Sequence, residues 1–223
     1  MVRKAQIEVP IPDRVAAGRT LARMLESYRN KTDAIVLALP RGGVPVAWEI
    51  ARELALPLDL LLVRKLGIPG HEEYAMGAIA SGGVRVFNEE ALRLGRVDDV
   101  SLELVSQREQ RELERRDRLY RGERPQPVLH DRQVLLVDDG LATGSTMRAA
   151  VQAVRQQGPA RIVLAVPVSS MEAIAILTPL VDEIVCPLVP DWLSSIGEWY
   201  HDFGQTSDRE VQELLRQAWE RTP

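Results

Sequence analysis

The residues with the clearest chemical potential lie between Val134 and Met147, where the sequence reads VLLVDDGLATGSTM. A short apolar run ends in two carboxylates, Asp138 and Asp139, and a loop of small and hydroxyl residues then leads into a predicted helix. Backbone N–H groups of such a loop and of a helix amino terminus bind phosphate. Carboxylates beside a phosphate site accept hydrogen bonds from sugar hydroxyls or hold Mg²⁺, so the pattern indicates a ribose phosphate. The residues expected to grip the phosphate are Ala142, Thr143, Gly144, Ser145 and Thr146.

Two other interpretations of this segment stay open. The acidic pair could form a pocket of the receiver-domain type, although such a pocket is not normally followed at once by Thr-Gly-Ser-Thr. The loop could also be an ordinary strand–helix turn with a Ser or Thr cap.

Two further polar segments follow predicted strands. Pro40-Arg41-Gly42-Gly43 comes after the apolar run at 34–39. Its glycines let a backbone approach a pyrophosphate closely, and Arg41 adds a charged contact. Arg64 and Lys65 end the run at 58–63, and Lys65 is the only lysine after position 31. Ligands of open α/β sheets bind at the carboxyl ends of the strands, so these residues are expected at the same edge as the acidic pair.

Strand and helix patterns alternate along most of the chain. Continuous apolar runs predict buried strands at 34–39, 58–63, 133–137, 161–166 and 183–186. Helices are predicted at 44–54, 145–156 and 170–177. This order predicts an α/β fold with a central, mainly parallel sheet and helices on both faces.

The whole chain, 1–223, is expected to form a single domain. Its core would comprise about 14–88 and 128–188, with a long loop and a short hairpin at 67–86. A charged helical insertion at about 89–127 is interpreted either as a solvated helix or as a lid or oligomer contact. The segment 189–223 carries an aromatic cluster and a helix at 207–219, and its aromatics could stack a flat base or simply anchor that helix.

Composition excludes several classes of protein. Charged residues make up 27% and the net charge is −4, so a nucleic-acid partner is disfavoured. No apolar stretch reaches the roughly 20 residues of a membrane-spanning helix, so no membrane partner is expected. Cys186 is the only cysteine, which excludes an internal disulfide and fits a reducing cytoplasm. The first predicted strand is not followed by G-x-G-x-x-G, which argues against a Rossmann oxidoreductase. A Walker A motif is also absent from the sequence.

The motif VLLVDDGLATGSTM resembles the phosphoribosyl-pyrophosphate (PRPP) signature of type I phosphoribosyltransferases. Pro40-Arg41-Gly42-Gly43 is similar to the pyrophosphate loop of that family. The segment 64–70, which begins with Arg64-Lys65, is similar to the basic stretch that follows the second strand, and Glu73-Tyr74 is similar to the flexible catalytic loop. The resemblance covers roughly 34–186. It is closest to bacterial proteins described only as predicted phosphoribosyltransferases.

The resemblance implies that Mg-PRPP and a nitrogen acceptor, with a nucleobase as one candidate, react with release of pyrophosphate. Mg²⁺, Arg41, Arg64 and Lys65 would stabilise the leaving pyrophosphate. Asp138 and Asp139 would hold the ribose hydroxyls, one of them through Mg²⁺. Glu73 would be the acid or base, and closure of the loop 67–77 would exclude water.

The resemblance also leads to expectations about the backbone at Arg41, the oligomeric state and the acceptor. The peptide entering Arg41 is often cis in this family, which predicts an unusual backbone there, and a homodimer is a common assembly. Ala142 stands where hypoxanthine–guanine-type relatives place an aspartate, which disfavours their base chemistry without selecting another acceptor. A regulator that senses PRPP or a nucleotide without turnover is the alternative function.

Overall fold

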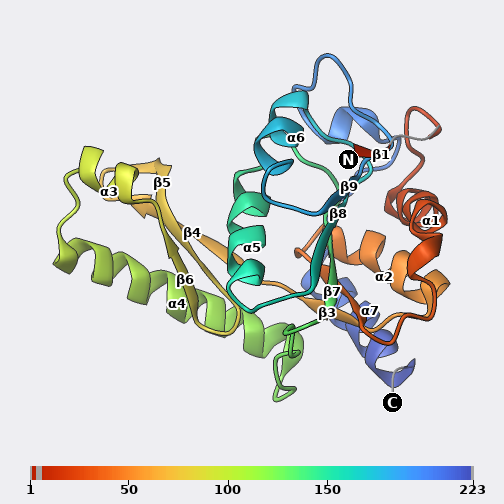
Figure 1. Ribbon diagram of the computed structural model, residues 1–223, viewed down its shortest axis with the longest axis horizontal. Coiled ribbons are helices and arrows are strands. Elements are labelled where there is room, and N and C mark those ends of the chain that lie inside the picture. Colours follow the sequence, from red (N-terminus) through yellow and green to blue (C-terminus); the bar gives the residue numbers. More distant parts are fainter. Residues whose placement is uncertain (1, 4–6, 222–223) are drawn as a thin grey trace.

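A six-stranded parallel sheet forms the centre of the structure (Figure 1). The computed structural model describes the backbone of residues 2–3 and 7–221, and the side chains of residues 7–221 apart from residue 73. All strand pairs of this sheet are parallel. In spatial order the strands are β1 (Val2–Arg3), β9 (Glu183–Val185), β8 (Arg161–Ala165), β7 (Gln133–Val137), β2 (Ala34–Ala38) and β3 (Leu58–Leu60).

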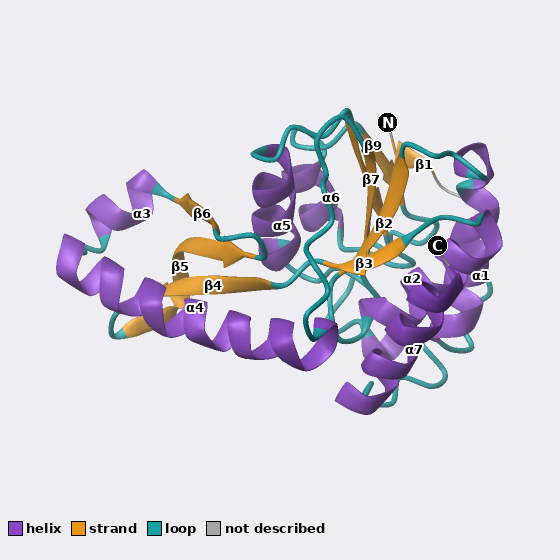
Figure 2. Ribbon diagram, turned by 90° about the horizontal axis from the view of Figure 1, so that it is seen from below, coloured by secondary structure: helices purple, strands orange, loops and turns teal. Residues whose placement is uncertain are grey.

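Helices cover both faces of this sheet, as Figure 2 shows. One face carries α5 (Ser145–Arg155) and α6 (Met171–Leu177). The other carries α1 (Arg14–Met24), α2 (Gly43–Leu54) and α7 (Asp208–Arg221). Short 3₁₀ turns lie at η1 (Glu26–Tyr28) and η2 (Gly197–Trp199). The predicted α/β class, with a parallel sheet between two helical layers, is therefore confirmed.

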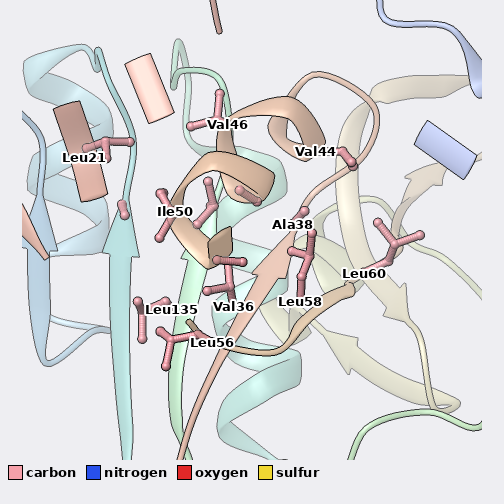
Figure 3. Close-up of a cluster of buried hydrophobic side chains, with 14 of the residues drawn as sticks. Leu21, Val36, Ala38, Val44, Val46, Ile50, Leu56, Leu58, Leu60 and Leu135 are labelled. Carbon is pink, nitrogen blue, oxygen red and sulfur yellow. The ribbon is translucent and has the colours of Figure 1, made fainter. Parts of the chain in front are cut away.

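The sheet separates two hydrophobic clusters, because successive side chains of a strand point to opposite faces. Val36 and Ala38 of β2 belong to the cluster under α1, α2 and α7, which Figure 3 shows around Ile50. Ile35 and Leu37 belong to the cluster under α5 and α6. Both faces of the strand are therefore buried, and this explains why its sequence is a continuous apolar run.

Residues 63–121 form an appended lobe at the left of Figure 1. A three-stranded antiparallel sheet comprises β4 (Val63–Ile68), β5 (His71–Ala80) and β6 (Val84–Phe87). Two helices follow, α3 (Glu89–Leu94) and α4 (Asp99–Arg121). Asn88 and Asp98 cap them by accepting hydrogen bonds from the N–H groups of Ala91 and Ser101.

The appended lobe corrects three sequence-based expectations. The predicted strand at 58–63 ends at Leu60, and a new strand of the second sheet begins at Val63. The predicted loop at 67–77 is mostly β-strand, since β4 and β5 are joined by a tight turn that contains Gly70 with φ of +78°. The insertion contains two helices instead of one, because Asp98 starts a second helix after Gly95.

Buried polar contacts join the appended lobe to the parallel sheet, two of them through the linking residues 61–62. The Leu61 N–H donates to the Ala38 carbonyl, 3.0 Å away, and the Ser81 N–H donates to the Leu62 carbonyl, 2.9 Å away. At the carboxyl end of α4, the buried Arg121 forms an ion pair with the buried Asp59 of β3. The carboxyl end of α4 is therefore fixed against the core.

None of the helices in the described part of the chain is both long and apolar enough to cross a membrane.

Candidate active site

The hydroxyl-rich loop connects the end of β7 to the amino terminus of α5. Gly144, with φ of +70°, is the residue before the helix, and this left-handed conformation favours glycine. Thr143 Oγ1 and Ser145 Oγ lie 3.1 Å apart. The Ser170 hydroxyl, at the start of α6, donates to the Ala142 carbonyl over 2.6 Å. The loop is thus held in a fixed shape at a helix amino terminus, where anions bind.

The acidic pair lies directly after β7. The Asp139 N–H donates to Asp138 Oδ1 over 2.8 Å. Burial and the neighbouring charge of Asp139 raise the pKa of Asp138 well above its usual range. Perturbed carboxylates in such positions are typical of functional sites.

Arg14, the first residue of α1, is a partner of this pair that the sequence analysis did not identify. Its Nε and Nη2 atoms lie 2.9 and 2.8 Å from Asp139 Oδ2. The same guanidinium lies over the Phe203 ring, 4.0 Å from its centroid. No motif surrounds Arg14 in the sequence, and 125 residues separate it from Asp139. Only the tertiary structure brings them together.

The carboxyl-terminal aromatic cluster supports the acidic pair. The Tyr200 hydroxyl donates to the Asp139 carbonyl over 2.7 Å, and its ring packs on Phe203 with centroids 4.8 Å apart. Burial, followed by the charge of Asp139, raises the pKa of Tyr200. Tyr200 is buried and therefore acts as an anchor, whereas Trp192 is 79% exposed and stays available for stacking.

The glycine loop touches the acidic pair. A Cβ atom on Gly42 would lie 1.9 Å from Asp139 Oδ2, and one on Gly43 would lie 2.8 Å from the Val137 carbonyl oxygen. No side chain fits at either position without displacing its neighbour. These glycines therefore allow two segments separated by almost 100 residues to meet at one edge of the sheet. The peptide between Pro40 and Arg41 is cis, as expected from the resemblance.

Arg41 reaches from this loop toward the carboxyl-terminal helix. Its Nη1 atom lies 3.6 Å from Asp208 Oδ1 at the start of α7. The Tyr120 hydroxyl of α4 donates to the same oxygen over 2.6 Å. This bond lowers the pKa of Asp208, and the charges of Arg41 and Arg116 act in the same direction. Asp208 was not identified from the sequence, because it looks like an ordinary acidic residue in a first helical turn.

Arg64 and Lys65 lie in β4 of the appended lobe, not at the end of a parallel strand as the sequence suggested. They point to opposite faces of the second sheet, since they are consecutive strand residues. Arg64 Nη2 and Nε lie 2.5 and 2.9 Å from Glu109 Oε2 of α4. Arg64 also lines a small cavity, of about 30 Å³, with Pro40 and Thr146. It therefore lies next to the loops at 40–43 and 142–146, which are expected from the sequence to bind phosphate groups.

Lys65 faces α5 across a larger cavity, of about 340 Å³. Ser145 and Arg148 of α5 line the other side. Among the residues that the structure describes, Lys65 forms no ion pair. The side chain of Glu73 lies outside the described residues, although its backbone belongs to β5.

The acidic pair fits a divalent cation that takes most of its ligands from a substrate. No group of three or more metal-ligating side chains occurs among the described residues. Asp138 and Asp139 supply two adjacent carboxylates. Mg²⁺ is typically bound through one or two carboxylates, with substrate phosphates and water completing its octahedron. Two carboxylates would leave the remaining ligand positions of such a cation to water and substrate oxygens.

Comparisons with known proteins agree with this geometry. The family model described as "Phosphoribosyl transferase domain" matches residues 10–176. A Mycobacterium tuberculosis protein named "Putative phosphoribosyl transferase Rv0571c" is 43% identical over 206 residues, which are 92% of this chain and 46% of that protein. The chain therefore spans less than half the length of this curated relative.

Solved structures extend the comparison to the fold. The crystal structure of TT1426 from Thermus thermophilus shares 43% identity with a TM-score of 0.83, covering 92% of this chain and 97% of that one. A hypothetical protein from Neisseria gonorrhoeae with bound ppGpp has 16% identity and a TM-score of 0.51, covering 96% and 99% of the two chains. The second likeness indicates a shared fold alone.

Proposed function

The chain belongs to the phosphoribosyl transferase domain family, and from that premise we propose that it transfers the phosphoribosyl group of Mg-PRPP to a nitrogen acceptor. A nucleobase is one such acceptor, which would place the protein in nucleotide metabolism. The contact between Gly42 and the Asp139 carboxylate carries this proposal. It supports the proposal because the loop expected to bind pyrophosphate touches a carboxylate expected to bind the ribose hydroxyls. The helix terminus expected to bind the 5′-phosphate follows next along the chain.

Each segment has one part in substrate binding. Residues 142–146 hold the 5′-phosphate through backbone N–H groups and the hydroxyls of Thr143, Ser145 and Thr146. Asp138 and Asp139 accept hydrogen bonds from the ribose hydroxyls. Arg41 and the amides around Gly42 and Gly43 hold the pyrophosphate. Held at both ends, the ribose has its C1 atom fixed for attack, which lowers the entropic part of the barrier.

The reaction breaks the bond between ribose C1 and a pyrophosphate oxygen and forms one between C1 and the acceptor nitrogen. The acceptor nitrogen loses its proton, and Glu73 remains our candidate for accepting it. Negative charge grows on the departing pyrophosphate, where Arg41, Arg64 and Lys65 stabilise it. Asp138 and Asp139 would hold Mg²⁺ when it is bound with the substrate, and this ion would supply further positive charge for the leaving group.

A regulator that binds PRPP or a nucleotide without turnover is the second candidate. The Neisseria gonorrhoeae protein of the same fold is described with bound ppGpp. This fold therefore accommodates a nucleotide polyphosphate in at least one protein. The hydroxyl loop and the acidic pair would serve such binding equally well.

Titration calorimetry with Mg-PRPP, together with a pyrophosphate-release assay over a panel of nucleobases, tests the proposal. We expect binding, and release with at least one base. Binding without release over a broad panel of nitrogen acceptors would favour the regulator. If Mg-PRPP does not bind, the transferase assignment is wrong and the loop serves another phosphate.

A further inference from the structure

The inward face of α4 carries polar residues toward the candidate site. Buried or half-buried positions recur at the spacing of one helical face, namely Ser106, Glu109, Leu113, Arg116 and Tyr120. Leu113 belongs to the hydrophobic core, and Tyr120 bonds to Asp208 beside Arg41. Arg116 therefore lies between an apolar contact and a hydrogen bond that both tie this face of α4 to the core.

The position of Arg116 is fixed from the carboxyl end of the helix. Arg121, five residues later, is buried and forms an ion pair with Asp59 of β3. Its Nη2 also donates to the Leu60 carbonyl over 3.2 Å, and its Nε lies 3.0 Å from Asp117. A buried pair with several hydrogen bonds has little freedom to slide, since breaking it would leave an uncompensated buried charge.

Three arginines from separate segments of the chain lie near the loops at 40–43 and 142–146. One of them, Arg41, belongs to the first of these loops. Arg64 of β4 and Arg116 of α4 line the cavity of about 30 Å³ that Pro40 and Thr146 also line. Arg41 follows Pro40 directly, and its partner Asp208 feels the charges of both Arg41 and Arg116. Each arginine has a carboxylate partner, and for Arg116 it is Glu112 Oε1, 2.8 Å from Nε.

Resting on the phosphoribosyltransferase function above, we propose that Arg116 contacts the pyrophosphate group of PRPP as a third arginine, supplied by the helical insertion. Its bond to Glu112 uses Nε, and a guanidinium has further N–H donors for phosphate oxygens. Arginine suits this task because its planar donors match phosphate oxygens in pairs. Arg116 transfers no atom or proton in the reaction, and it stabilises charge on the leaving group.

Arg115 provides a matched control on the same helix. It too pairs with Glu112, with Nε 2.8 Å from Oε2. Its side chain is more exposed than that of Arg116 and lines a different cavity, with Leu104 and Arg111, instead of the one that Pro40 and Thr146 line. Arg115→Gln and Arg116→Gln therefore remove the same charge from the same carboxylate partner, and only Arg116 lines the cavity that Pro40 and Thr146 also line.

The test is calorimetry of inorganic pyrophosphate and of Mg-PRPP with the full chain. Charged hydrogen bonds are strong enough that Arg116→Gln should weaken both ligands by about tenfold or more. Arg115→Gln should change them by about twofold or less, as expected for an exposed ion pair. Ribose 5-phosphate, which lacks the pyrophosphate, should bind equally to both variants. Arg116→Lys keeps the charge and should recover part of the affinity.

The outcomes separate this inference from the function on which it rests. If the unaltered protein binds Mg-PRPP and the two glutamine variants behave alike, Arg116 is only a surface residue and the inference is wrong. Equal weakening of ribose 5-phosphate and pyrophosphate by Arg116→Gln alone would indicate a distorted fold, and would also overturn it. If the unaltered protein binds neither pyrophosphate nor Mg-PRPP, both the inference and the proposed function fail.

Discussion

The parallel sheet and the sheet of the appended lobe are stabilised differently. The parallel sheet is covered on both faces by apolar side chains, and most residues of β2, β7 and β8 are completely buried. The sheet of the lobe is buried mainly on one face, the face toward α4, where ion pairs such as Arg64–Glu109 and Arg85–Glu103 accompany apolar side chains. Its other face borders the cavity beside α5.

This difference suits the two halves of the proposed reaction. Loops on a densely packed sheet keep the phosphate and ribose contacts fixed, since such interiors have few alternative arrangements. Cations held by carboxylates on a more open lobe can exchange those partners for phosphate oxygens. The core would thus position the substrate, and the lobe would supply charge to the leaving group. The following predictions test this division.

The largest effect is expected from a cavity in the core. Leu136→Ala in β7 should lower the free energy of unfolding by about 3–5 kcal/mol, because the side chain is completely buried between the sheet and α5. Val86→Ala in β6 of the lobe should cost about 1 kcal/mol or less, since this side chain is only partly buried. Urea denaturation measures both. Equal losses would mean that the lobe is packed as tightly as the core.

The next effect concerns ligand binding at the core edge. Replacing Asp138 and Asp139 together by Asn should weaken Mg-PRPP by about tenfold or more, because charged acceptors for ribose hydroxyls and Mg²⁺ are lost. The fold should remain intact. Asp131→Asn, an exposed change at the opposite end of β7, is the control and should bind normally. Unchanged affinity in the double variant would remove the acidic pair from the site.

A smaller effect, on rate and not on affinity, is expected from the lobe. Lys65→Ala should leave Mg-PRPP affinity nearly unchanged and slow turnover by about tenfold, since its charge is needed as the pyrophosphate leaves. Arg85→Ala removes a cation from β6 of the same sheet, on the face that pairs with Glu103 of α4, and should retain full turnover. Steady-state kinetics distinguish them. Equal rates in the two variants would exclude Lys65 from catalysis.

The smallest effect concerns the carboxylate that holds Arg64. Glu109→Gln should tighten pyrophosphate binding by about two- to threefold, because a neutral amide competes less strongly for the guanidinium than a carboxylate does. Calorimetry with inorganic pyrophosphate measures the change. Weaker binding instead would show that Glu109 positions Arg64 for the ligand and does not compete with it.

The core was predictable because its elements carry strong local signals. Runs such as 133–137 are apolar throughout, since both faces of the parallel sheet are buried. Most strands and helices of the core accordingly match their predicted ranges within a few residues. The strand at 58–63 is shorter than predicted, and α1 and β1 were not predicted at all. The lobe was predicted less well. In β4 and β6 buried and exposed positions mix, and glycines in 67–83 resemble a loop although several of them form strand or tight turns.

The sequence by itself determined the α/β class and the segments that we propose bind phosphate, because buried strands and glycine–hydroxyl loops are local patterns. It also placed Asp138 and Asp139 directly after a buried strand. Only the tertiary structure decided which distant side chains complete the site. Arg14 meets Asp139 across 125 residues, and Arg64 meets Glu109 across 45. Such pairs depend on how helices pack against a sheet. The residues next to an arginine or a glutamate in the sequence do not indicate which distant side chain it will contact.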